Sequence, residues 1–129
     1  MSRVRRELRA GAPTALVFLI AFVVGACSGA SATPVPVPPG AVVLTVKDST
    51  FAPEAITAPG AAGFKLYFDI AEALPHNVVF VAADGTRTFQ SDTFSGVQQR
   101  VYNVPALTPG TYKLICDIHP EMHGTLTVP

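Results

Sequence analysis

The sequence has little of what defines several common classes of protein. Only 14% of its 129 residues are charged, and nine Lys and Arg residues are balanced by nine Asp and Glu residues. A protein that binds nucleic acid usually carries an excess of positive charge. From residue 27 onward the chain has five basic and eight acidic residues, which gives a net charge of −3. We therefore expect no nucleic acid among its partners.

Long apolar runs are also scarce. The longest covers residues 15–26, and its twelve residues would span only ~18 Å as a helix, whereas the hydrocarbon core of a bilayer is ~30 Å thick. An arginine-rich start precedes this run, which is typical of a cleaved export signal. We expect residues 1–26 to be a signal peptide, and the Arg5-Arg6 pair leaves twin-arginine export open beside the general route.

Cysteine occurs only twice, at Cys27 and Cys116. Cys27 directly follows the apolar run and the small residues Gly25 and Ala26, an order that resembles the lipobox of bacterial lipoproteins. We therefore expect Cys27 to be acylated. Two or three acyl chains would anchor the protein firmly, because one chain alone binds a membrane only marginally. A chance cysteine after an ordinary signal peptide is one alternative. A disulfide between Cys27 and Cys116 is another, since exported proteins permit it.

Residues 27–40 differ in composition from the rest of the chain. This stretch is rich in Ser, Ala and Pro and has no apolar period, which predicts a disordered tether. Residues 41–129 lack any helical period and show short alternating runs separated by turn residues, the pattern of one all-β sandwich domain. Strands are expected at residues 42–46, 55–57, 64–70, 77–82, 97–104, 111–116 and 125–128, and residues 88–96 are expected to form a loop.

A dense cluster of metal-binding side chains stands near the end of the chain. Cys116, His119, Met122 and His123 lie within eight residues, between two strand-like runs. Thiolate, imidazole and thioether groups are soft or borderline ligands, and this combination suits copper. Alternate residues of a strand point to the same face. Cys116 therefore points the same way as the inward-facing residues of the strand before it, and we expect it to be buried at the strand end. The cluster therefore predicts a metal-binding loop.

A further ligand would have to come from another loop. The only other histidine is His76, which immediately precedes the most apolar strand-like run, residues 77–82. If that strand lies antiparallel to the strand before the cluster, His76 reaches the same end of the sandwich. Other assignments stay open at this point: His76 as a surface residue, Cys116 as a structural thiol, and Met122 as core filler with His123 as a ligand in its place.

Two motifs together resemble the cupredoxins, the small blue copper proteins. Pro75-His76-Asn77-Val78-Val79-Phe80 is similar to the plastocyanin pattern, and the short Cys116-x-x-His119-x-x-Met122 loop is similar to the amicyanin pattern. The resemblance covers residues 41–129. It implies a Greek-key β-sandwich with one type 1 copper ion. The loop at residues 69–75 departs from the family pattern, because it lacks the Asn or similar residue that often precedes the ligand histidine.

The resemblance also implies a role for each residue of the site. His76, Cys116 and His119 would form the plane of ligands around copper, with Met122 as a weak axial ligand. Asn77 would lie behind the ligands and pin the loop that carries Cys116. His123 would be an exposed neighbour of the site rather than a ligand.

By the same resemblance, the protein is expected to be an electron carrier that cycles between Cu(II) and Cu(I) and not an enzyme. Leu74, Pro75 and Pro120 would surround the exposed edge of His119, and small apolar patches of this kind suit brief contacts between redox partners. The partner would be a cytochrome, an oxidase, a reductase or a photosynthetic centre. We expect an exported monomer, lipid-anchored at the outer face of the cytoplasmic membrane or in the periplasm.

Three alternative functions use the same residues differently. A copper-delivery lipoprotein would share the ligands but hold Cu(I) without a redox role. A copper enzyme such as a multicopper oxidase or nitrite reductase needs further centres built from extra histidines, often in His-x-His pairs. This chain has three histidines and no such pair. A metal-free adhesive sandwich would leave the cluster unused.

Overall fold

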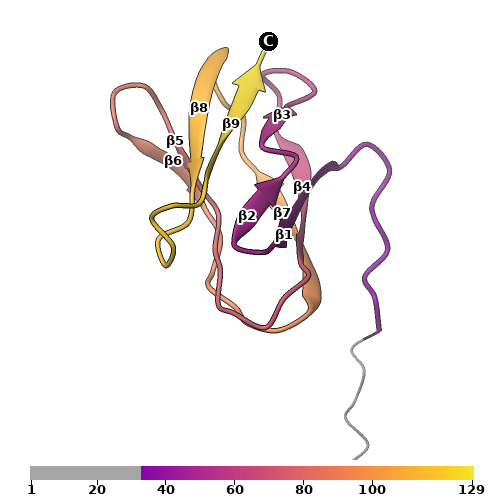
Figure 1. The fold of residues 1–129 in the computed structure, drawn as a ribbon. Coiled ribbons are helices and arrows are strands. Elements are labelled where there is room, and N and C mark those ends of the chain that lie inside the picture. Colours follow the sequence, from indigo (N-terminus) through magenta and orange to yellow (C-terminus); the bar gives the residue numbers. More distant parts are fainter. Residues whose placement is uncertain (1–32) are drawn as a thin grey trace, which may run out of the picture. The chain divides into compact units, whose positions relative to one another are not determined.

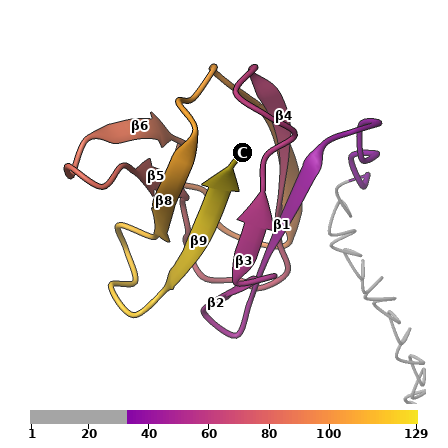
Figure 2. The same ribbon diagram turned by 90° about the horizontal axis from the view of Figure 1, so that it is seen from above.

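The computed structural model describes residues 33–129, and the expected signal peptide and acylated Cys27 lie outside these residues. The described chain is all-β, with nine strands and no helix, which confirms the predicted fold class. Accordingly, none of residues 33–129 belongs to a helix that could cross a membrane. Figures 1 and 2 show the strands arranged as two facing layers.

The first layer is a four-stranded sheet in the order β2-β1-β4-β7. It is mixed, because β1 and β4 run parallel while β1–β2 and β4–β7 are antiparallel. Its strands are β1 (Val42–Lys47), β2 (Thr50–Ala52), β4 (Phe64–Ile70) and β7 (Gln98–Val104).

The second layer is a five-stranded sheet in the order β3-β9-β8-β5-β6. Its strands are β3 (Ala55–Thr57), β5 (Val79–Val81), β6 (Arg87–Gln90), β8 (Gly110–Ile115) and β9 (His123–Val128). β5 lies antiparallel to β8, with Val79 opposite Ile115. This register brings the start of β5 beside the end of β8, so His76 and Cys116 lie at the same end of the sandwich.

Alternating side chains from both sheets form the core between the layers. In β4, the even-numbered residues Phe64, Leu66, Phe68 and Ile70 are buried, while Lys65 is exposed. The same period of two places alternate residues of β8 in the core. Each large apolar side chain that is fully buried contributes about 1.5–3 kcal/mol. The core therefore provides a stiff frame for the loops at its ends.

Besides shifts of one or two residues at the ends of other strands, three strands differ from the sequence-based expectation. β6 occupies the start of the stretch expected to be a loop, because it pairs with β5 and packs Phe89 against Phe80 with ring centroids 4.9 Å apart. β5 is shorter than expected, since the Ser91 hydroxyl accepts the Val78 N–H at 3.0 Å in place of a strand partner. β2 was not predicted at all, and it forms a tight hairpin with β1.

Residues 33–40, which precede the first strand, have no regular secondary structure apart from a turn. The Tyr67 hydroxyl donates a hydrogen bond of 2.8 Å to the carbonyl oxygen of Val35. Tyr67 stands on the face of β4 that points away from the core cluster, yet it is only 7% exposed. We infer that the segment at residues 33–40 covers it.

Candidate metal centre

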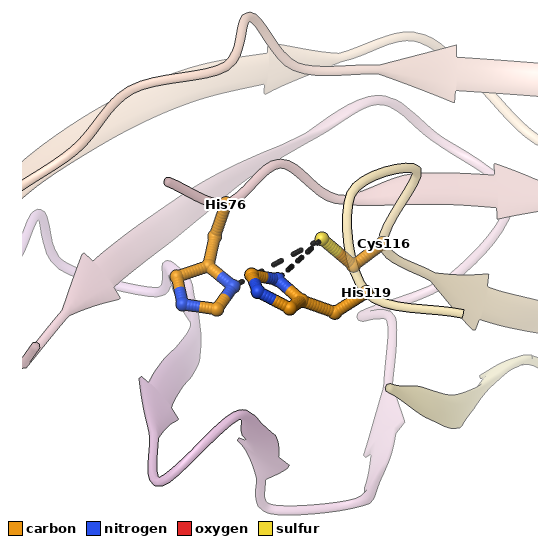
Figure 3. A group of neighbouring side chains, drawn as sticks. All are labelled: His76, Cys116 and His119. Atoms are coloured by element: carbon orange, nitrogen blue, oxygen red, sulfur yellow. Dashed lines mark hydrogen bonds between the residues drawn. The ribbon is translucent and has the colours of Figure 1, made fainter. Parts of the chain in front are cut away.

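Three potential ligands converge at one end of the sandwich. One ligand atom each from His76, Cys116 and His119 lies within 4.8 Å of the others. The Cys116 Sγ is 3.9 Å from Nδ1 of His76 and 3.9 Å from Nδ1 of His119. Figure 3 shows the two imidazoles and the thiol pointing toward one another. The three donors can therefore share a single small ion.

Cys116 and His119 are positioned by a tight loop between β8 and β9. Cys116 directly follows the last residue of β8 and is buried. Its N–H donates to the Met122 carbonyl at 3.4 Å, and the Met122 N–H donates to the His119 carbonyl at 2.9 Å. These bonds fold the loop back on itself, so the thiol and the imidazole face the same point.

His76 comes from the loop between β4 and β5 and is fully buried. Its backbone exchanges hydrogen bonds of 3.0 and 3.1 Å with Phe94, which fixes the main chain before β5. Burial lowers the pKa of His76 below its ordinary value, although the adjacent Glu72 carboxylate acts in the opposite direction. The imidazole is therefore neutral near pH 7 and has a lone pair available for a metal.

Glu72 contacts the other nitrogen of His76 and was not predicted from the sequence. Its Oε1 lies 2.5 Å from Nε2 of His76. Burial raises the pKa of Glu72, but hydrogen bonds from Ser49 and His76 outweigh this effect and bring the pKa below its ordinary value. Its only sequence signal was its place four residues before His76.

Met122 and His123, the two remaining members of the cluster, differ sharply in exposure. Met122 is 1% exposed and belongs to the core cluster together with Cys116. His123 is exposed, and its Nδ1 lies 2.8 Å from the Glu121 carbonyl oxygen. Among the described residues, His123 is not part of the group of converging ligand atoms.

Asn77 connects the two loops behind the site. Its side chain donates to Asp117 Oδ2 at 3.0 Å and accepts the Asp117 N–H at 2.8 Å. Arg87 on β6 forms a two-pronged ion pair with the same carboxylate at 2.8 and 3.0 Å. The hydrogen bonds from Arg87 and then Asn77 hold the pKa of Asp117 below its ordinary value. Asn77 was predicted from the sequence, whereas Asp117 and Arg87 were not.

The expected docking residues lie on the two loops that carry the ligands. Leu74 is 49% exposed, Pro120 is exposed, and Pro75 is partly buried. Ile118, an apolar residue beside His119, is also exposed. His119 itself is only partly buried, in contrast to His76 and Cys116.

The donor set at this site fits copper. One thiol, two imidazoles and a buried thioether combine ligands that favour Cu(I) with ligands that also serve Cu(II). Carboxylate oxygens, which harder cations prefer, do not belong to the converging group found among residues 33–129. The fit therefore follows from the chemistry of the side chains as well as from their convergence.

Known proteins share this fold and parts of this sequence. The family model described as a cupredoxin-like domain matches residues 14–128. Amicyanin-alpha of Methylorubrum extorquens is 37% identical over 67 residues, which cover 52% of this chain and 56% of the amicyanin. The match thus spans little more than half of that relative's length.

Solved structures of similar fold include an auracyanin and an amicyanin. Auracyanin from Roseiflexus castenholzii matches with a TM-score of 0.61 at 16% identity, covering 70% of this chain and 97% of the auracyanin. Amicyanin from Paracoccus versutus matches with a TM-score of 0.57 at 27% identity, covering 72% of this chain and 85% of the amicyanin.

Proposed function

Because the chain belongs to the cupredoxin-like family, we propose that it carries single electrons by means of one copper ion. The observation that supports this most directly is the convergence of His76, Cys116 and His119 within 4.8 Å. Together with Met122, these residues are arranged as a type 1 copper site. Copper, when bound, supplies a centre that alternates between Cu(II) and Cu(I).

Each ligand has a proposed role. His76, Cys116 and His119 would hold the copper ion, Cys116 as the thiolate, and Met122 would supply a weaker thioether donor. A bound metal ion itself favours the deprotonated thiol. His119 is the ligand nearest to solvent, so its imidazole edge is the point where an electron enters or leaves.

The surrounding residues keep the ligands in place in both oxidation states. Asn77 and Asp117 join the two ligand loops by reciprocal hydrogen bonds, and Arg87 ties this pair to β6. The complete burial of His76 keeps water from that side of the site. A site that changes little between states lets an electron move with little structural rearrangement, which suits a carrier.

A small apolar surface around His119 would receive the redox partner. Leu74, Pro75 and Pro120 contribute to it, on the loops before and after the ligands. Small contact areas suit transient complexes, because the partners must separate after each transfer. The partner belongs to one of four classes of electron-transfer protein: a cytochrome, an oxidase, a reductase or a photosynthetic centre.

The proposal includes an exported and membrane-anchored state of the protein. Residues 1–26 would be removed as a signal peptide, and acylated Cys27 would hold the domain at the outer face of the cytoplasmic membrane or in the periplasm. The arginine-rich start, the short apolar run and the position of Cys27 directly after it support this location. The domain would act there as a monomer, and residues 27–40 would connect it to the anchor.

A carrier is a better fit than an enzyme with several metal centres. Within residues 33–129, a single group of converging ligands is present. Copper delivery without a redox role is the second candidate, since it could use the same ligands. The two functions differ in colour and redox behaviour.

The deciding experiment is an absorption and paramagnetic-resonance spectrum of the copper-loaded protein. A type 1 carrier is intensely blue as Cu(II), because the Cys116 thiolate donates charge to the metal, and it is reduced reversibly. Cys116→Ser is expected to abolish the colour, whereas His123→Ala is expected to retain it. A colourless Cu(II) form, or a protein that only holds and passes on Cu(I), would reject the carrier and favour delivery.

A further inference from the structure

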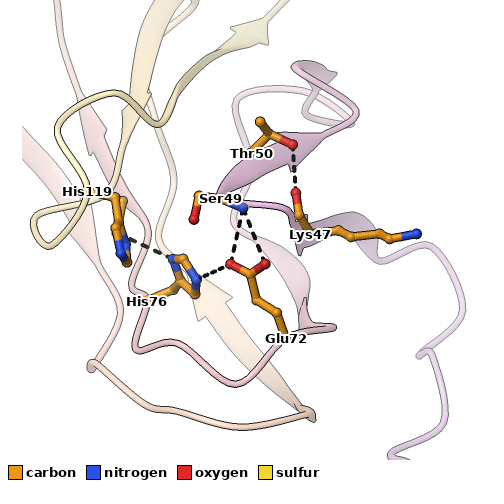
Figure 4. A network of polar contacts seen from close by, with 7 residues as sticks. Lys47, Ser49, Thr50, Glu72, His76 and His119 are labelled. Carbon is orange, nitrogen blue, oxygen red and sulfur yellow. Dashed lines mark hydrogen bonds and ion pairs between the residues drawn. The ribbon is translucent and has the colours of Figure 1, made fainter.

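The two nitrogens of His76 have different partners. Nδ1 faces the sulfur of Cys116 at 3.9 Å, and Nε2 faces Glu72 Oε1 at 2.5 Å. His76 is fully buried and the side chain of Glu72 is only 17% exposed, so solvent competes little for this contact. Figure 4 shows the Glu72 carboxylate lying between His76 and the chain at Ser49.

Glu72 is itself held from the other side by a turn of the first sheet. The Ser49 N–H donates to both carboxylate oxygens, at 3.2 and 3.3 Å. Asp48 and Ser49 are the two loop residues of the β1–β2 hairpin, because Lys47 pairs directly with Thr50. The carboxylate therefore connects the β1–β2 turn to a proposed metal ligand.

The turn adopts an uncommon backbone conformation at this point. Asp48 has a φ of 51° and Ser49 a φ of 53°, both in the left-handed region. A two-residue hairpin loop with positive φ at both positions matches the twist of the strands, but it normally prefers Gly at the second position. In this turn, the Ser49 N–H points at Glu72.

The Glu72 carboxylate determines which nitrogen of His76 carries the proton. An ionised carboxylate only accepts hydrogen bonds, so Nε2 must be the protonated nitrogen of the neutral ring. Nδ1 then presents its lone pair toward Cys116, where the other donors converge. A carboxylate that holds the second nitrogen of a ligand histidine also makes the imidazole a stronger donor.

We propose that Glu72, held by the Ser49 amide, is a positioning residue that fixes the Nε2–H tautomer of His76 and lowers the reduction potential of the site. The second effect follows from charge, since a nearby anion stabilises the more positive oxidised form. This inference rests on the proposed electron-carrier function. It goes beyond that function by assigning the control of one ligand to a turn in the opposite sheet.

The test compares four variants of the full-length protein. Glu72→Gln removes the charge but keeps an acceptor oxygen, and Glu72→Ala removes both. Glu54→Gln is the matched control, because Glu54 is an exposed carboxylate near Met122 that makes no contact with His76. Ser49→Gly retains the N–H that holds Glu72 and suits the positive φ.

The first measurement is the tautomer of His76 in the metal-free protein, from long-range ¹H–¹⁵N correlation spectra. The unaltered protein, Glu72→Gln and Ser49→Gly are expected to show Nε2–H alone, and Glu72→Ala a mixture of both tautomers. The second measurement is the reduction potential. Both Glu72 variants are expected to favour the reduced form about tenfold more, a shift of ~59 mV for one electron. Ser49→Gly and Glu54→Gln should change it far less.

Two results would overturn the inference. One is an unaltered protein whose metal-free His76 carries its proton on Nδ1. The other is a Glu72→Gln variant whose potential moves no further than that of Glu54→Gln. Failure of the proposed function looks different, because the unaltered Cu(II) protein would then be colourless while its His76 still showed the Nε2–H tautomer.

Discussion

Among the single residues of the site, exposure divides the proposed ligands into two kinds. His76, Cys116 and Met122 are buried, and His119 is partly open to solvent. Burial protects the sulfur atoms and fixes their surroundings. One open imidazole leaves a single short route between the metal and a partner protein. The division suits a site that exchanges electrons with a partner protein.

Met122 provides a prediction at this scale. Met122→Leu replaces a thioether by a hydrocarbon of similar size in the core, so the free energy of unfolding of the metal-free protein should fall by less than ~1.5 kcal/mol. Loss of the thioether donor would remove electron density from the oxidised site. We expect the blue colour to persist and the reduction potential to rise, with the reduced form favoured about tenfold more, or ~59 mV.

Voltammetry and absorption spectra of the Met122→Leu protein check this prediction. Leu126→Met is a suitable control, because Leu126 is fully buried in β9 and outside the ligand loop. It exchanges the same two side chains in the opposite direction and should leave the potential unchanged. A Met122→Leu potential equal to that of the unaltered protein would show that Met122 only fills the core.

Among the strands, local pattern predicts some elements and misses others. β4 and β8 were predicted because their alternation is a property of their own residues. β6 was not, because Arg87–Gln90 is largely polar and becomes a strand only through pairing with β5 and the packing of Phe89. A strand that forms only through pairing with a neighbouring strand has a weak β pattern in its own sequence.

The same limit applies to predicting the residues of the site from the sequence. Cys116, His119 and His76 were found because these side chains are rare in the chain and stand at informative spacings. Glu72 and Asp117 are ordinary loop carboxylates. Glu72 stands four residues before His76 but is also held by Ser49 of a distant turn, and Asp117 pairs with Arg87 of β6. Only the folded arrangement gives them a role.

Gly124 in β9 packs closely against the backbone of Glu54, which lies between β2 and β3. A Cβ at this position would lie 2.5 Å from the backbone oxygen of Glu54, and that oxygen accepts the Thr125 N–H at 2.8 Å. The close approach leaves no space for a methyl group. Gly124→Ala must therefore displace the chain at Glu54, and overpacking of this kind typically costs about 1–3 kcal/mol.

Urea unfolding of the metal-free protein measures that cost. Thr127→Ala is the control on the same strand, because its side chain is exposed and its loss should change the free energy of unfolding by no more than ~0.5 kcal/mol. If the two variants have equal free energies of unfolding, the chain at Glu54 moves aside without a cost in stability.

On the scale of the whole molecule, a hydrogen bond from Tyr67 ties the segment before β1 to β4. Tyr67→Phe removes the hydrogen bond to the Val35 carbonyl and should lower stability by about 0.5–1.5 kcal/mol. Its clearest effect should be faster amide hydrogen exchange in residues 33–40, with an unchanged reduction potential. Tyr112→Phe removes a hydrogen bond to Thr108 instead. If both variants leave exchange in residues 33–40 unchanged, Tyr67 does not hold the segment.

The proposed docking surface yields the last prediction, which concerns contact between whole molecules. Leu74 is half exposed on the loop that precedes His76, so Leu74→Asp should leave the colour and the potential nearly unchanged. In an encounter that brings two His119 edges together, the added charges repel each other and must lose water. An unfavourable change of about 1.4 kcal/mol would slow electron self-exchange about tenfold.

Self-exchange is measured from NMR line widths in mixtures of the oxidised and reduced protein. Val37→Asp is the matched control, because Val37 is similarly exposed but lies in the segment before β1. Greater ionic strength should restore part of the Leu74→Asp rate, since salt screens exposed charges. If Leu74→Asp and Val37→Asp exchange electrons equally fast, the molecules do not meet at the surface around His119, and the electron leaves by another face.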